Sequence, residues 1–208
     1  MKSRQKECIM NSGLLTFYQQ ENNEVGKMQE QEIESYLAEL GQELQNLGVQ
    51  YPIRILLVGG AFMLTQIHNR STTNDVDVLL KDGEDSTTAP RYQIFRAAVR
   101  AVARHNKLPS NWLNDIMGDF LRDTGTAPDG TLWRTYTMLE VYIPPSDYVL
   151  ALKLFAGRPK DRDDIHSLCQ QLPIRTRKQA QRLVDRYIPN RQVQQLNHLD
   201  DTLDDLFP

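Results

Sequence analysis

The sequence predicts a mixed α/β fold, in which a small mixed β-sheet is flanked by helices and followed by a helical C-terminal part. Two short runs of mostly branched apolar residues, 53–58 and 76–80, have the length and composition of buried strands. Around them, apolar residues recur at three- and four-residue steps, as they do on one face of a helix. The resulting order of strand, turn, helix, turn and strand indicates helices packed on a sheet.

Composition limits the class of protein. The chain has 208 residues, of which 40% are hydrophobic and 25% charged, and its formal net charge is -3. These values suit one globular domain with extensions and are too apolar for a disordered chain. Only Cys8 and Cys169 are present, so no disulfide framework is expected. No apolar run approaches the length of a membrane span, so we expect a cytoplasmic protein with no membrane partner.

The elements of the core follow in order. Segment 31–47 has apolar residues at helical spacing, and Gly48 ends it. Helical spacing also predicts helices at 61–68 and 90–105, and alternation of Thr, Tyr, Val and Leu predicts a third strand at 133–143. Segment 106–132 carries many turn residues and is expected to form an irregular covering region. We therefore divide the chain into a polar N-terminal arm, a core and a helical C-terminal region, at 1–30, 31–145 and 146–208.

The C-terminal region is predicted to contain successive helices. Ser146 is the expected N-cap of the first and Gly157 its stop. A second helix begins at Asp163 or Asp164. Thr176 opens a third with a Thr-x-x-Gln capping box, and the tail from residue 192 has the spacing of a last amphipathic helix.

Two carboxylates carry the strongest chemical signal. Asp75 and Asp77 are two residues apart at the start of a predicted strand, so their side chains lie on one face while Val76 and Val78 face the core. Adjacent negative charges repel each other, and a hard cation such as Mg²⁺ prefers carboxylate oxygens. The pair therefore predicts a metal site, although a lone Asp-x-Asp is usually a solvated strand start.

A candidate phosphate site lies upstream. Gly59 and Gly60 join a predicted strand to a helix, where backbone N–H groups and the helix dipole favour an anion. Arg70 could add a charge, and Ser71, Thr72 and Thr73 could add hydroxyl donors. A lone Gly-Gly pair is more often only a turn. The ordered combination with the carboxylates favours nucleotide chemistry.

The stretch VGGAFMLTQIHNRSTTNDVDVLL resembles the signature of the polymerase-beta-type nucleotidyltransferase superfamily, which pairs a Gly-Gly or Gly-Ser turn with a downstream DxD or DxE. The stretch YVLALKLFAGRPKDRDDIHSL resembles the AbiEii-type toxin and related uncharacterised nucleotidyltransferase-like group. Together the two stretches cover about a quarter of the chain. The string DVDVL also resembles the first motif of haloacid-dehalogenase-type phosphatases, but polar residues precede Asp75 where that motif requires an apolar strand.

The resemblance implies a role for each matched residue. Gly59 and Gly60 would hold nucleotide phosphates, Asp75 and Asp77 would hold Mg²⁺ or Mn²⁺, and Lys153 would reach the triphosphate of the NTP substrate. The four residues that follow in the second stretch would support the acceptor side or the fold: Asp161, Arg162, Asp163 and Asp164.

Three of these assignments have a plain alternative. The superfamily often uses a third carboxylate on a neighbouring strand, for which Glu140 is the candidate by position, although it is equally well a solvated strand residue. Lys153 is otherwise a snorkelling lysine, and the Asp161 cluster is otherwise a helix cap with a local ion pair.

A basic stripe is predicted near the C-terminus, formed by Arg175, Lys178, Arg182 and Arg186. Such a stripe is usually a solvated face, and the alternative is contact with RNA or an acidic protein partner. The sequence as a whole therefore predicts a Mg²⁺-dependent nucleotidyltransferase, with a toxin–antitoxin or defence role implied by resemblance alone. The competing hypothesis is a catalytically inactive module that binds a nucleotide or a partner.

Overall fold

A computed structural model describes residues 27–81, 89–115, 118 and 125–208 of the chain. Its centre is a five-stranded mixed sheet with the strand order β3-β2-β1-β5-β4. The strands are β1 Ile53–Leu57, β2 Val76–Leu80, β3 Leu113–Asn114, β4 Thr131–Tyr136 and β5 Leu139–Ile143. β1 runs antiparallel to β2 and parallel to β5, and β2 runs parallel to β3. The predicted fold class is confirmed.

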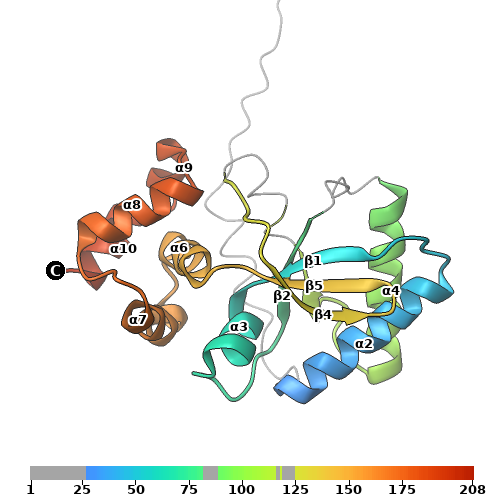
Figure 1. Cartoon of the computed structure of the whole chain (residues 1–208). Helices are drawn as coiled ribbons and strands as arrows, with labels where there is room; N and C mark the ends of the chain where they lie inside the picture. Colours follow the sequence, from blue (N-terminus) through green and yellow to red (C-terminus); the bar gives the residue numbers. More distant parts are fainter. Residues whose placement is uncertain (1–26, 82–88, 116–117, 119–124) are drawn as a thin grey trace, which may run out of the picture.

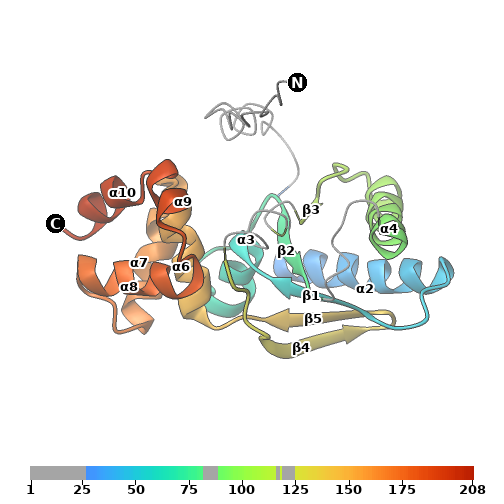
Figure 2. The same ribbon diagram turned by 90° about the horizontal axis from the view of Figure 1, so that it is seen from above.

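Two helices cover one face of the sheet (Figures 1 and 2). They are α2 Glu30–Asn46 and α4 Pro90–Asn106, and both bury the apolar residues that recur at helical spacing. Alternate residues of the strands face these helices, including Val76 and Val78, which are fully buried. Because strand side chains alternate, Asp77 and Leu79 face the other side.

The second face meets the C-terminal helices through α3 Gly59–Phe62, the π-helix η1 Met63–Ile67 and α6 Ser146–Ala156. Leu56 and Leu79 of the sheet share a buried cluster with Phe62, Met63 and the apolar residues 148–152, 154 and 155 of α6. Helices α7 Arg162–Gln171, α8 Arg177–Tyr187, α9 Arg191–Leu196 and α10 Leu199–Leu206 complete this part, on the left in Figure 1. The 3-10 turn η2 Pro159–Asp161 leads from α6 into α7.

Several predicted boundaries match. β2 occupies the predicted residues 76–80, α4 starts at the predicted Pro90, and Gly157 ends α6 in the left-handed conformation. The capping box of α8 is present, because the Thr176 side chain accepts from the Gln179 N–H. Ser146 is the first residue of α6, one position inside the N-cap, which is Pro145.

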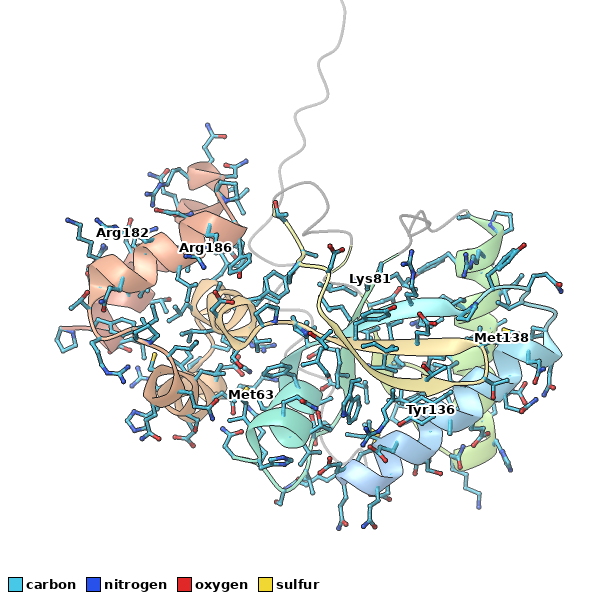
Figure 3. All side chains as sticks on the ribbon, viewed as in Figure 1. Met63, Lys81, Tyr136, Met138, Arg182 and Arg186 are labelled. Atoms are coloured by element: carbon cyan, nitrogen blue, oxygen red, sulfur yellow. The ribbon has the colours of Figure 1, made fainter. Side chains whose placement is uncertain are left out.

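The predicted strand 133–143 is wrong in one respect, because this segment folds into the hairpin of β4 and β5. Thr137 and Met138 form the two-residue turn, with Thr137 in the left-handed region at a φ of 48°. Met138 lies at the tip of the hairpin (Figure 3). No Gly, Asn or Asp marks this turn, so the alternating pattern runs through it without a visible break.

One other boundary is corrected. The predicted last helix is divided into α9 and α10, because His198 adopts a left-handed conformation between them. The predicted arm 1–30 lies mostly outside the described residues. Within its described part, Met28 is buried and forms a bridge with Thr73.

Candidate functional site

The junction of β1 and α3 places the predicted Gly-Gly turn beside Asp77. Gly59 has a φ of +63°, and a Cβ at this position would overlap the Asp77 carboxylate. The backbone of Val58 pairs with that of Asp77, so the end of β1 and the start of β2 are level. Gly59 is therefore required both by its left-handed conformation and by the space that Asp77 occupies.

Asp75 and Asp77 form the predicted carboxylate pair at the start of β2. Both side chains are only partly covered, while Val76 between them is fully buried. Burial and then the neighbouring charge of Asp75 raise the pKa of Asp77 from 3.8 to about 6. The positive charges of Arg158, Lys153 and Lys160 act in the opposite direction without cancelling this effect. A positive ion at the pair would relieve the repulsion.

Asn114 on β3 lies directly beside Asp77. The two residues are partners in the parallel β2–β3 ladder, and Nδ2 of Asn114 donates to Oδ1 of Asp77 across 3.3 Å. The strand adjacent to the carboxylate pair thus supplies an amide where the resemblance implies a third carboxylate. An amide carbonyl is also an oxygen ligand of hard cations, and rotation of the amide would turn Oδ1 toward the pair.

Gly60 is covered by two side chains of the η1–β2 loop. A Cβ on Gly60 would overlap Oγ1 of Thr73 and would lie 3.5 Å from Nη1 of Arg70. Arg70 thus occupies the predicted position beside the turn. The hydroxyl next to the turn belongs to Thr73, which is buried and donates to the carbonyl of Asp75.

Ser71 and Thr72, the other two predicted hydroxyl donors, lie differently from Thr73. Ser71 is exposed and Thr72 is partly covered. Ser71 and Arg70 line a surface pocket of about 520 Å³, whose other walls include Glu34, His68 and Arg134. Two of the four predicted polar residues of this loop thus reach a surface that a ligand can enter.

Five charged side chains form a cluster behind the turn, which we call the charge cluster: Arg70, Lys153, Arg158, Asp161 and Asp164. Lys153 and the two aspartates are buried, and the two arginines are partly exposed. Lys153 of α6 is 3% exposed and lies 2.7 Å from Asp161 and 2.6 Å from Asp164. Arg70 makes a two-point ion pair with Asp164 through Nε and Nη2, and Arg158 binds the second oxygen of Asp161 at 2.6 Å. The cluster joins the η1–β2 loop to α6, η2 and α7.

The carboxylates of this cluster are held in their charged form. Burial alone would raise the pKa of Asp161, but the charges of Lys153 and Arg158 outweigh it and lower the pKa. The pKa of Asp164 is likewise lowered, because hydrogen bonds from Arg70 and Lys153 outweigh the effect of burial. Both aspartates therefore act as fixed anions in the protein interior.

The four consecutive residues of the predicted support cluster divide into two pairs. Asp161 and Asp164 are 1% exposed and belong to the charge cluster. Arg162 and Asp163 are exposed on α7, where Arg162 pairs with Asp205 of α10. Helical spacing explains the division, since positions 161 and 164 lie on one face of the helix start and 162 and 163 on the other.

The predicted third carboxylate, Glu140, does not join the pair. In the parallel β1–β5 ladder, Glu140 is paired with Arg54 of β1. Asp77 is paired instead with Val58, which lies four residues further along the chain from Arg54. The separation along the strand is about 13 Å at 3.3 Å per residue. Glu140 instead accepts a hydrogen bond from the Tyr142 hydroxyl at 2.9 Å. Its assignment to the metal site is therefore corrected, because the sheet register places it elsewhere.

The predicted basic stripe is partly neutralised. Arg175 precedes α8 and donates to backbone carbonyls at the end of α7, and Arg186 pairs with Asp147 at 3.0 Å. Lys178 and Arg182 are exposed. Arg182 and Arg186 lie on the outer side of the C-terminal helices (Figure 3). The stripe therefore offers only part of its formal charge to a partner.

Two searches of the described residues gave negative results. No group of three or more His, Cys, Asp or Glu side chains in the described ranges has the arrangement of a metal site. Likewise, no helix formed by these residues has the length and apolar character needed to cross a membrane. Comparison of the chain with protein-family models, with curated proteins and with solved structures returns no match.

Two residues at the site were not predicted from the sequence: Asn114 and Arg158. Arg158 directly follows Gly157, the predicted end of α6, and this position after the helix stop was the available signal for it. Asn114 carried no signal, because β3 has only two residues.

Proposed function

We propose that the protein is a Mg²⁺-dependent nucleotidyltransferase that moves a nucleoside monophosphate from an NTP to an acceptor hydroxyl. The observation that carries this proposal is the contact of Asp77 with Gly59, which brings the carboxylate pair against the Gly-Gly turn at the start of α3. Nucleotidyl transfer needs a cation and a phosphate cradle at the same place. The acceptor oxygen would bond to the α-phosphorus while the bond to the pyrophosphate oxygen breaks, and the acceptor proton would leave to solvent or to a carboxylate.

The residues at the site fit a divalent cation. Asp75 and Asp77 offer carboxylate oxygens, and Asn114 offers an amide oxygen. Burial and then the charge of Asp75 raise the pKa of Asp77, and a bound cation would offset both effects. When bound, Mg²⁺, or Mn²⁺ in its place, would supply charge neutralisation for the phosphates. The absence of side chains at Gly59 and Gly60 lets Asp77 and Thr73 pack against the turn, and Arg70 holds a positive charge next to Gly60.

The acceptor class is an RNA, a protein or a small hydroxylated molecule. The 520 Å³ pocket beside Arg70 and Ser71 has room for part of such a molecule, and Lys178 and Arg182 are the stripe residues exposed to an RNA or acidic protein partner. A role in a toxin–antitoxin or defence system and a cytoplasmic location belong to this same proposal, on the resemblance described for the sequence.

The test is incorporation of labelled nucleotide. Purified protein is incubated with Mg²⁺ and each of the four labelled NTPs, with RNA, protein and small hydroxylated acceptors supplied in turn. We expect incorporation that is lost in Asp75→Ala and in Asp77→Ala. Glu140→Gln is the matched control, because it removes a carboxylate from the same sheet face at about 13 Å along the strand from Asp77. Equal loss in the control would contradict the assignment of the site.

A second candidate function is a nucleotide-binding or partner-binding module without catalytic activity. The position of Asn114 favours it, because the strand beside Asp77 offers an amide instead of a third carboxylate. A site with two carboxylates would bind a Mg²⁺–nucleotide and lack a base for the acceptor. Binding of Mg²⁺–NTP with no incorporation into any acceptor would support this module and reject the enzyme.

A further inference from the structure

We propose that Arg158, with Lys160 beside it, forms the polyphosphate-binding subsite of this protein, and that Lys153 serves as an internal counter-ion. This inference deepens the proposed function and rests on it for the identity of the nucleotide. The subsite itself is defined by charge and exposure, and it can be tested with an inorganic polyphosphate.

Lys153 is poorly placed to bind a ligand. Its side chain is 3% exposed, and its ammonium group lies within 2.7 Å of one carboxylate and 2.6 Å of another. A phosphate would have to displace both aspartates from a buried lysine, and each buried carboxylate would then lose one of its positive partners, which is unfavourable. Lys153 is therefore a structural partner of these two aspartates inside the charge cluster.

Arg158 belongs to the same cluster but reaches solvent. Its side chain is 40% exposed, and within the described part of the chain its side-chain partner is Asp161, which Nε contacts at 2.6 Å. An arginine has five N–H donors in a planar fork, and Nε accounts for one of them. The two terminal nitrogens are thus the part of the cluster best suited to bind phosphate oxygens in a two-point arrangement.

The position of Arg158 relative to the Gly-Gly turn follows from a chain of contacts. Gly60 is covered by Arg70, whose Nη2 lies 3.7 Å from Asp161, and Asp161 binds Arg158. The charge of Arg158 also reaches Asp77, which borders Gly59. Arg158 therefore lies on the same side of the molecule as the turn and the carboxylate pair.

The charge cluster itself is positive, while Asp75 and Asp77 carry the negative charge on the metal side of the turn. The cluster has three positive and two negative side chains, which leaves one net positive charge. Lys160 is exposed on the η2 turn two residues after Arg158 and adds a second one. A triphosphate or pyrophosphate group carries several negative charges close together, and this is the ligand chemistry that such a patch selects.

The experiment measures binding of sodium tripolyphosphate, pyrophosphate, ATP and AMP to the full chain by calorimetry at low ionic strength. Arg158→Gln is expected to weaken tripolyphosphate and ATP binding about tenfold, as the loss of a charge-assisted pair does. Lys160→Gln is expected to weaken it by about threefold. AMP, which has no polyphosphate group, should lose less than twofold in either variant.

Arg104→Gln is the matched control, because it removes one exposed positive charge from α4 on the opposite face of the sheet. Arg158→Gln also breaks an ion pair with a buried aspartate, so its folding is checked by circular dichroism. If Arg158→Gln does not fold, the inference is tested with Lys160→Gln and Arg158→Lys instead. Arg158→Lys should bind tripolyphosphate less tightly than wild type. Unchanged tripolyphosphate affinity in the folded variants, or no binding by wild type, would overturn the inference.

The two proposals fail separately. Nucleotide incorporation that is lost in Asp77→Ala and intact in Arg158→Gln and Lys160→Gln would keep the transferase and reject the subsite. Polyphosphate binding that depends on Arg158 and Lys160, without incorporation by wild type, would keep the subsite and reject the transferase. Equal weakening in Arg104→Gln would show that only the net charge of the molecule matters, and would also reject the subsite.

Discussion

Asn114 on β3 lies beside Asp77 on β2, and its amide Nδ2 is 3.3 Å from Oδ1 of that carboxylate. The two residues face the same side of the sheet because they are partners in a parallel ladder. The position is the one from which a third metal ligand could reach a cation bound by Asp75 and Asp77. It therefore offers a direct test of the proposed metal site.

Asn114→Asp is predicted to increase affinity for Mg²⁺ by about tenfold, because a third carboxylate adds a charged ligand for a hard cation. Without metal the same variant should be less stable than wild type, since a third negative charge joins a repelling pair. Isothermal calorimetry and thermal melts with and without Mg²⁺ measure both effects. Asn114→Ala is the control and should bind Mg²⁺ more weakly than wild type. An Asn114→Asp variant that binds no more tightly would place β3 outside the metal site.

Asp77 is predicted to make stability depend on pH in the metal-free protein. The pKa of an ordinary aspartate is 3.8 and that of Asp77 in the folded protein is about 6, so the folded state binds the proton more tightly. The free energy of unfolding should therefore fall as the pH rises from about 4 to 6, by at most about 3 kcal/mol. Urea denaturation at several pH values measures this dependence.

Asp77→Asn supplies the comparison for this pH effect. The variant cannot ionise, so its advantage over wild type should grow between about pH 4 and pH 6 and stay constant above that range. Asp161 and Asp164 have lowered pKa values and act in the opposite direction, at lower pH, in both proteins. Mg²⁺ should restore wild-type stability at pH 7 and leave Asp77→Asn nearly unchanged. A stability difference between Asp77→Asn and wild type that stays constant across the pH range would argue against a raised pKa at Asp77.

Gly59→Ala is predicted to remove nucleotide incorporation and to lower stability by more than its backbone strain alone. The new Cβ would overlap the Asp77 carboxylate, so either the turn or Asp77 must move. Gly48→Ala is the matched control, because Gly48 also has a positive φ and its Cβ would meet nothing within 4 Å. The control isolates the left-handed strain, about 1–2 kcal/mol. Equal stability loss and equal activity in the two variants would show that Asp77 does not need the space at Gly59.

Local patterns in the sequence were sufficient for much of the fold. The apolar runs gave β1 and β2 to within one residue, and the Thr176 capping box marked the start of α8. Period-two spacing correctly placed Asp77 opposite the buried Val76 and Val78. These features depend on neighbouring residues only, which is why one sequence is enough to predict them.

Other features depend on register and long-range pairing, which a single sequence does not specify. Whether Glu140 reaches Asp77 is decided by how β5 pairs with β1, and the observed register separates them. Asn114 became visible only through the pairing of a two-residue strand with β2. The Thr137–Met138 turn lacks the usual glycine or asparagine, so the hairpin could not be distinguished from one continuous strand.

Lys153→Met is predicted to destabilise the fold by about 3–5 kcal/mol, because it would leave two buried carboxylates short of a positive partner. Chemical denaturation at pH 7 measures this loss. Lys160→Gln is the control for removing a lysine at the surface, and it should change stability by less than about 0.5 kcal/mol.

The double variant Lys153→Met with Asp161→Asn should recover part of the lost stability, since it removes one of the two unpaired charges. This recovery distinguishes a structural counter-ion from a phosphate ligand. A lysine whose task is to contact the triphosphate would leave stability unchanged when it is replaced, and it would lower only nucleotide affinity. A stable Lys153→Met protein with weakened ATP binding would therefore assign the lysine to the ligand and contradict its place as a counter-ion.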